Sequence, residues 1–114
     1  MGITVSFIDS KTVSLTSPLS PNINHKDTAF GGSLSSLAIL SCWTLIHYKL
    51  DEITKNYNLV VQKSQINYHA PVNGEFTSTC KLKDVKDWIR FKDSLFKFGK
   101  ARIILQSEVW ANNR

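Results

Sequence analysis

A polar loop that ends in a glycine pair carries the residues best suited to chemistry. It spans residues 22–33 and contains Asn24, Asp27 and the pair Gly31-Gly32. Backbone amides at the start of a helix can stabilise negative charge that develops on a carbonyl oxygen. Glycines disfavour a helix start, so the pair indicates either close packing against a neighbouring backbone or a ligand resting on bare amides. Both interpretations stay open on the glycines alone.

Other polar side chains near the loop offer weaker candidates. Asp27 is a possible base for activating water, or else a helix cap or a solvated loop residue. His25 is a possible base beside Asn24, or a solvated loop histidine. Ser33 and Ser36 lie one helical turn apart and can orient water. A serine nucleophile would need an adjacent base, and the sequence indicates none.

The remaining histidines and cysteines are expected to be structural. His47 and His69 lie in a predicted helix and a predicted strand, and no spacing of histidine, cysteine, aspartate and glutamate suggests a metal. Cys42 and Cys80 are expected to be free thiols of a reduced compartment, with Cys42 as inert core. The chain shows no secretory signal at its start, so a cytoplasmic location is expected.

The elements that position the loop are one long helix and several strands. The apolar run to about Leu50 is apolar on nearly every side, which predicts a buried helix, and its polar residues argue against a membrane span. Period-two alternation predicts strands before and after it. The predicted strands are Ile3–Ile8, Thr12–Ser17, Leu59–Tyr68, Phe76–Leu82 and Ala101–Ala111, and residues 84–98 are predicted to form a helical or irregular crossover. The sequence therefore predicts one α+β domain over residues 1–114, with an antiparallel sheet around one central helix.

Composition allows a packed core and places the positive charge in one segment. The 114 residues are 42% hydrophobic and carry a net charge of +5. Eight of the 14 basic residues and three of the nine acidic ones lie between Lys81 and Arg102, so that segment accounts for the whole excess. A basic patch can meet a phosphorylated small molecule, an acidic protein or nucleic acid, or be a solvated face without a partner. Nucleic acid is disfavoured, because no recognition motif or aromatic stacking platform accompanies the charge.

Two separated motifs resemble those of hot-dog-fold acyl-thioesterases. The run Asn24-x-x-Asp27-x-x-Phe30-Gly31-Gly32 resembles the family's Asn-x-x-Gly-x-x-His-Gly-Gly signature. Residues 68–75 resemble the family's Tyr-x-x-Pro-Val-x-Gly-Asp/Glu element. More narrowly, residues 18–33 resemble the thioesterase domain at the C-terminus of YiiD-type proteins.

The resemblance implies a hot-dog fold, a homodimer and an acyl site beside the start of the central helix. It implies that Asn24 and the amides of Gly31 and Gly32 polarise a thioester carbonyl. In the family, the last strand follows a segment like Ser107–Trp110 after a short turn. Here the sequence stops at Arg114, so the resemblance implies that this strand is missing. The sheet would then have an unprotected edge, so that either the protein is truncated or something else covers this edge.

The chain departs from the family pattern at two positions, and the resemblance also implies a class of substrate. The family's helix carboxylate falls on Ile39, which cannot act as a base, and its histidine falls on Phe30. The substrate is expected to be an acyl thioester of coenzyme A or of acyl carrier protein, with no further cofactor. The basic segment would receive its phosphates or the acidic face of the carrier. The expected substrate-binding residues are Phe30, Ser33, Ser36, Tyr68, Lys97, Lys100 and Arg102. The alternative is a non-catalytic acyl-thioester-binding or dimerisation module, which Ile39 and the missing strand favour.

Overall fold

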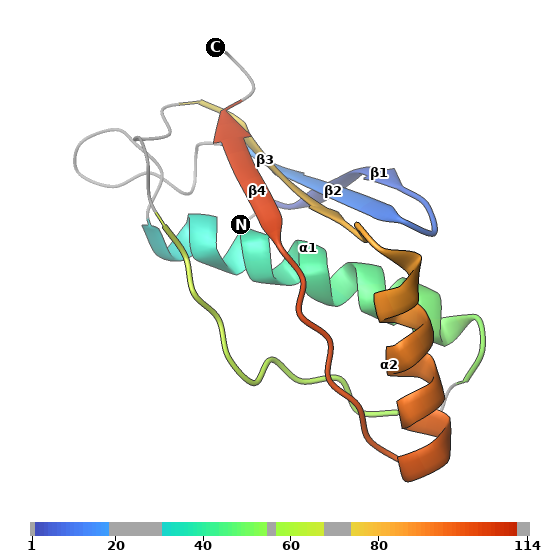
Figure 1. Ribbon diagram of the computed structural model, residues 1–114. Coiled ribbons are helices and arrows are strands. Elements are labelled where there is room, and N and C mark those ends of the chain that lie inside the picture. The colour runs from blue at the N-terminus through green and yellow to red at the C-terminus, as the bar shows by residue number, and fades with distance from the viewer. Residues whose placement is uncertain (1, 19–30, 55–56, 68–73, 112–114) are drawn as a thin grey trace.

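The computed structural model describes residues 2–18, 31–54, 57–67 and 74–111, and within them an α+β fold (Figure 1). The strands are β1 (Thr4–Ile8), β2 (Thr12–Ser17), β3 (Phe76–Lys81) and β4 (Ser107–Ala111). They form one antiparallel sheet in the order β1-β2-β3-β4. The helices are α1 (Gly31–Asp51) and α2 (Val85–Phe98). The predicted hairpin and central helix are confirmed, and the strand predicted over Phe76–Leu82 forms as β3.

A tight turn sets the register of the first hairpin. The carboxylate of Asp9 accepts hydrogen bonds from the backbone amides of Lys11 and Thr12, at 2.8 and 2.7 Å. This closure pairs Ile8 with Val13 across the two strands. Small polar residues at such turns satisfy their own backbone, which is why this short segment folds locally.

One face of the sheet packs on α1 and the other is lined by hydroxyl groups. Along β2, Val13 and Leu15 are buried and pair with residues of β3. The alternate residues Thr12, Ser14 and Thr16 are half-buried. On the hydroxyl face, Ser14 bonds Thr79 at 2.7 Å and Thr16 bonds Thr77 at 2.8 Å. The strands therefore present an apolar face to the helix and a polar face away from it.

The core lies between the sheet and α1. Each fully buried leucine or phenylalanine contributes about 1.5–3 kcal/mol of transfer free energy. A buried hydrogen bond of 2.9 Å between Ser41 and Ser78 ties α1 to β3 within this core. The buried apolar side chains are Val13, Leu15, Leu34, Leu37, Leu45, Ile46, Leu50, Phe76, Cys80, Leu82, Trp88 and Phe91.

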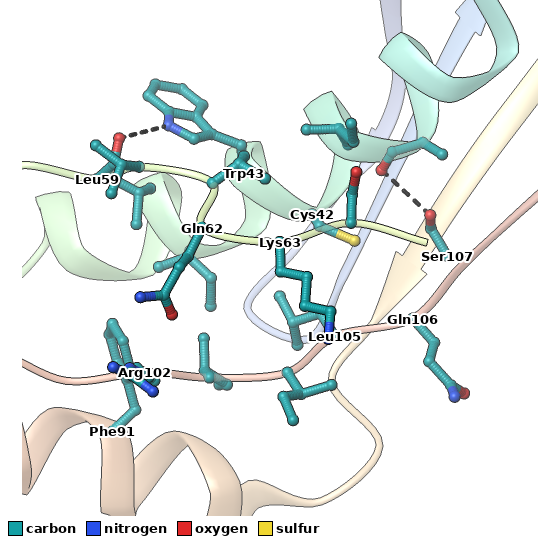
Figure 2. A pocket seen from close by; sticks show the side chains of 18 of the residues that line it. Cys42, Trp43, Leu59, Gln62, Lys63, Phe91, Arg102, Leu105, Gln106 and Ser107 are labelled. Atoms are coloured by element: carbon teal, nitrogen blue, oxygen red, sulfur yellow. Dashed lines mark hydrogen bonds between the residues drawn. The ribbon is translucent and has the colours of Figure 1, made fainter. Parts of the chain in front are cut away.

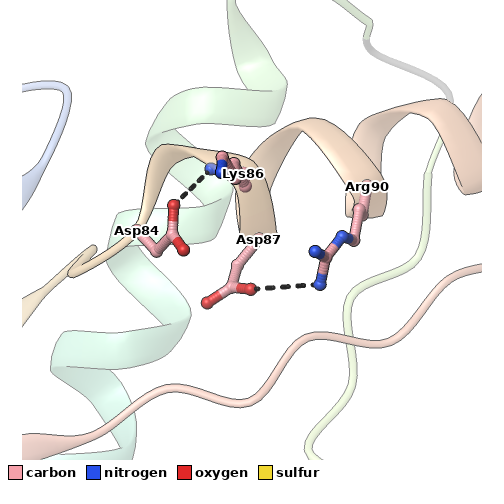
Figure 3. Close-up of polar contacts among 4 residues, drawn as sticks. All are labelled: Asp84, Lys86, Asp87 and Arg90. Atoms are coloured by element: carbon pink, nitrogen blue, oxygen red, sulfur yellow. Dashed lines mark hydrogen bonds and ion pairs between the residues drawn. The ribbon is translucent and has the colours of Figure 1, made fainter.

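The ambiguous crossover is a capped helix. The Asp84 carboxylate accepts a hydrogen bond from the amide of Lys86 at 2.9 Å (Figure 3). Gly99 ends α2 at a φ of 77°. That left-handed conformation favours glycine, and the Gly99 amide donates to the Leu95 carbonyl. Asp87 and Arg90 form an exposed ion pair at 3.9 Å that adds little stability (Figure 3).

Two strand predictions are wrong in extent. Residues 57–67 are extended but pair with no strand among the described residues, so the strand predicted over Leu59–Tyr68 does not form there. The last strand begins at Ser107 rather than at Ala101. Alternation fixes which face a side chain takes, but a strand also needs a neighbouring backbone for its hydrogen bonds.

Candidate functional site

A long open groove runs beside α1. Its walls are the extended residues 57–67 on one side and residues 99–111 on the other, and α1 forms its floor (Figures 1 and 2). It encloses about 3000 Å³. Small-molecule pockets occupy roughly 300–1,000 Å³, so this groove is larger than such a pocket.

An aromatic cluster anchors the first wall to α1. The indole nitrogen of Trp43 donates a hydrogen bond of 3.3 Å to the carbonyl of Leu59 (Figure 2). The hydroxyl of Tyr57 lies 2.5 Å from Nδ1 of His47. The rings of Trp43 and His47 stack at 4.7 Å, which is possible because the two residues are four apart on one helix face. His47 thus belongs to the aromatic cluster that joins α1 to the first wall.

Alternating side chains build the second wall. Residues 101, 103, 105 and 107 are half-buried, whereas 102, 104 and 106 are exposed. Ser107 donates a hydrogen bond of 3.1 Å to the carbonyl of Ala38, which ties the start of β4 to α1. Lys83 donates to the side-chain oxygen of Gln106 at 3.0 Å. The alternation of half-buried and exposed side chains in β4 therefore already begins at residue 101, before the residues that pair with β3.

The floor of the groove contains a pair of thiols. Cys42 of α1 lines the groove, and its thiol is hydrogen-bonded to that of the buried Cys80 of β3. A hydrogen bond from Cys80 lowers the pKa of Cys42 and outweighs burial, which raises it. Hydrogen bonds with Ser107 and Ser41 lower the pKa further. The hydrogen bond with Cys42 and burial raise the pKa of Cys80. Both thiols are free, as predicted, but Cys42 lines a groove rather than sitting in inert core.

The start of α1 is suited to an anion. The helix begins at Gly31, and its first turn contains no acidic residue. The partial positive charge of its N-terminal amides is therefore not neutralised from within that turn. Leu34 and Ser35 line the floor of the groove just beyond the helix start, and Ile39 lines it further along α1.

The structure brings some predicted site residues to the groove. Lys100 and Arg102 line it, whereas Lys97 is exposed and lies over the Phe98 ring at 5.3 Å. Ser33 is half-buried and Ser36 is exposed, and neither lines the groove. The predicted residues that lie outside the described part of the chain are Asn24, Asp27, Phe30 and Tyr68.

Two features of the site are not predicted from the sequence. They are the contact between Cys42 and Cys80 and the hydrogen bond from Trp43 to the Leu59 carbonyl. The first depends on the register of β3 against α1, which no local pattern specifies. The second had a signal, because Trp43 and His47 share one helix face. In residues 2–18, 31–54, 57–67 and 74–111, no group of three metal-binding side chains comes together, and no helix has the length and hydropathy to cross a membrane.

Comparison with known proteins identifies relatives over the whole length. Residues 1–114 match the family model described as "Putative thioesterase (yiiD_Cterm)". A crystal structure of a protein of unknown function from Chlorobaculum tepidum is 38% identical and superposes with a TM-score of 0.93, covering 98% of this chain and 69% of that one.

Two more distant crystal structures share the fold. One, from Shewanella oneidensis and described as a "putative thioesterase", is 23% identical, with a TM-score of 0.83 and coverage of 100% of this chain and 76% of that one. The other, from Pseudomonas aeruginosa and described as a "probable thioesterase", is 19% identical, with a TM-score of 0.78 and coverage of 97% and 72%. The predicted hot-dog fold is thereby confirmed.

Proposed function

Because this chain belongs to the YiiD C-terminal thioesterase family, we propose that it hydrolyses acyl thioesters of coenzyme A or of acyl carrier protein. The observation that carries the proposal is the start of α1. A glycine pair opens a helix of 21 residues whose first turn has no carboxylate. Such a helix end attracts negative charge, and thioester hydrolysis develops negative charge on the carbonyl oxygen.

The proposed reaction is attack of water on the thioester carbonyl. The amides of Gly31, Gly32 and Ser33 would donate to the oxyanion, and Asn24 would hold the water or the carbonyl. The tetrahedral intermediate then collapses by breaking the carbon–sulfur bond. The products are the free acid and a thiol, whose low pKa relative to an alcohol makes the thiolate a good leaving group.

The base is proposed to come from the loop rather than from the helix. Ile39 occupies the family's carboxylate position and is half-buried along the groove. An aliphatic side chain accepts no proton, so another group must do so. Asp27 is the nearest carboxylate in sequence to the glycine pair and is our candidate.

The groove suggests how the rest of the substrate binds. The α1 side of the groove carries apolar side chains that would contact an acyl chain, including Leu34, Ile39 and Ile46. Lys100 and Arg102 supply positive charge for phosphates or for an acidic carrier protein. We propose a homodimer as the working unit, in line with the architecture that the family resemblance implies.

The test is hydrolysis of acyl-CoA substrates that differ in chain length. Release of free thiol is followed with a chromogenic disulfide, in parallel with the same acyl groups on acyl carrier protein. Turnover with either carrier supports the proposal and gives the preferred chain length. A folded protein that turns over neither carrier would contradict it.

The half-buried Ile39 favours a second candidate, an acyl-thioester-binding module without turnover. Such a module would be stabilised by acyl-CoA without consuming it. A rise in melting temperature with intact acyl-CoA recovered after incubation distinguishes this outcome from hydrolysis.

A further inference from the structure

Two thiols meet in the core where α1 packs on the sheet. The fully buried Cys80 of β3 pairs with Ser107 of β4, and Ser78 lies two residues before it on the same face of the sheet. Cys42 belongs to α1, and its thiol is hydrogen-bonded to that of Cys80. The two sulfur atoms are therefore neighbours, although the residues are 38 positions apart in the sequence.

Two hydrogen bonds around the thiols hold them in place. Ser41, next to Cys42 in α1, bonds Ser78 of β3 at 2.9 Å. Ser107 donates at 3.1 Å to the carbonyl of Ala38, which lies about one turn before Cys42 in the helix (Figure 2). The thiols thus meet because side chains within this chain tie α1 to β3 and to β4. Their contact does not depend on the free edge of β4 or on the exposure of Cys42.

The two thiols differ in how easily they ionise. The hydrogen bond from Cys80 lowers the pKa of Cys42, so Cys42 is the more easily ionised of the two. The hydrogen bond with Cys42 and burial raise the pKa of Cys80, which therefore keeps its proton. A thiolate reacts with a peroxide to give a sulfenic acid, and a neighbouring thiol converts that acid to a disulfide. The pair contains one group suited to each step.

We propose that hydrogen peroxide converts Cys42 and Cys80 to an intramolecular disulfide, a reversible cross-link that fastens α1 to β3. The Cys42 thiolate attacks one peroxide oxygen, the oxygen–oxygen bond breaks, and the hydroxide that leaves takes up a proton to become water. The sulfur of Cys80 then attacks the sulfenic sulfur, the sulfur–oxygen bond breaks, and the Cys80 proton leaves with the hydroxide as a second water. The two thiols are oxidised by two electrons, which reduce the peroxide.

The cross-link would change the stability of the chain. It closes a loop between residues 38 positions apart, and such a loop restricts the unfolded chain. We expect the oxidised protein to melt about 10 °C above the reduced one, and dithiothreitol to reverse the shift. The inference does not rest on thioester hydrolysis, because it concerns a core contact and not the start of α1.

The test is oxidation of the folded full chain by hydrogen peroxide at low protein concentration. Free thiols are then blocked with iodoacetamide, and the intact mass and the proteolytic peptides are measured. We expect a monomer that is lighter by two hydrogen atoms and a single cross-linked peptide pair that contains Cys42 and Cys80. Dithiothreitol should return both thiols to the blockable form.

Two serine variants separate the roles of the thiols. Cys80→Ser keeps a donor beside Cys42 but removes the second sulfur, so peroxide should add oxygen atoms to Cys42 and form no cross-link. Cys42→Ser is the matched control, in which the buried Cys80 should stay unmodified. Circular dichroism checks that both variants fold, and the peptide map of the wild type tests the proposal without either variant.

Four results would overturn the proposal. The first is oxygen added to Cys42 of the wild type with no cross-link. The second is no reaction at a peroxide concentration that oxidises a free cysteine peptide. The third is a disulfide that joins two chains and grows with protein concentration. The fourth is cross-linking as fast in urea-unfolded protein as in folded protein, because packing of α1 on β3 would then play no part.

Discussion

At the scale of single residues, the two thiols differ most from what the sequence indicates. Both cysteines lie in apolar stretches, which predicts two free thiols, with Cys42 as inert core. In the structure, Cys80 donates to Cys42 and leaves it the more easily ionised of the pair. The difference comes from a contact between α1 and β3, residues 38 positions apart, that no short-range pattern specifies.

Thiol labelling tests this assignment. The thiolate is the reactive form, so a lowered pKa means that Cys42 reacts at a pH below the usual range for cysteine. We expect iodoacetamide to modify Cys42 first and to modify Cys80 only on unfolding. Mass spectrometry of labelled peptides over a pH series measures both rates.

The variant Cys80→Ala removes the donor and should raise the pKa of Cys42, which slows its labelling at neutral pH. Cys80→Ser is the matched control, because its hydroxyl can still donate. Equal labelling of Cys42 in both variants and in the wild type would contradict the hydrogen bond.

At the scale of elements, short-range patterns explain most of what could be predicted. The β1–β2 hairpin follows from alternation around Asp9, and α1 follows from an apolar run between a glycine pair and a polar stretch. Residues 59–67 carry a strand pattern as good as that of β3, yet they pair with nothing in the described part of the chain. Alternation reports local conformation, whereas pairing depends on a backbone distant in sequence.

The caps of α2 lead to a prediction on stability. Asp84→Ala removes the acceptor for the Lys86 amide and should lower the free energy of unfolding by about 0.5–2 kcal/mol. Arg90→Ala removes only the exposed pair with Asp87 and should cost less than about 0.5 kcal/mol. Urea unfolding of the two variants measures both. Equal losses would show that the cap does not hold the helix.

At the scale of the whole molecule, five of the 14 basic residues line one groove. The basic segment predicted from composition divides in the structure, because Lys100 and Arg102 line the groove and Lys97 does not. Charge composition predicts that a basic patch exists, but only the fold decides which of its members face a common ligand. Asn24, Asp27, Phe30 and Tyr68 lie outside the described residues, so their assignments stay predictions.

This division predicts unequal effects on substrate affinity. Lys100→Glu with Arg102→Glu should raise the KM for acyl-CoA and leave kcat nearly unchanged, because the phosphates lie far from the scissile bond. Lys97→Glu changes the net charge without touching the groove and should have a much smaller effect. The KM values are compared at low salt, where charge interactions are least screened. Similar shifts in both variants would mean that only net charge matters.

The most direct measurement is thioester hydrolysis by the wild type, Asn24→Ala and Asn22→Ala side by side. The last variant is a matched control from the same loop. The proposed site predicts that Asn24→Ala lowers kcat by about a hundredfold, as for loss of one oxyanion or water-positioning donor, while Asn22→Ala stays close to wild type. Turnover that is unchanged in Asn24→Ala, or absent in a folded wild type, would contradict the account.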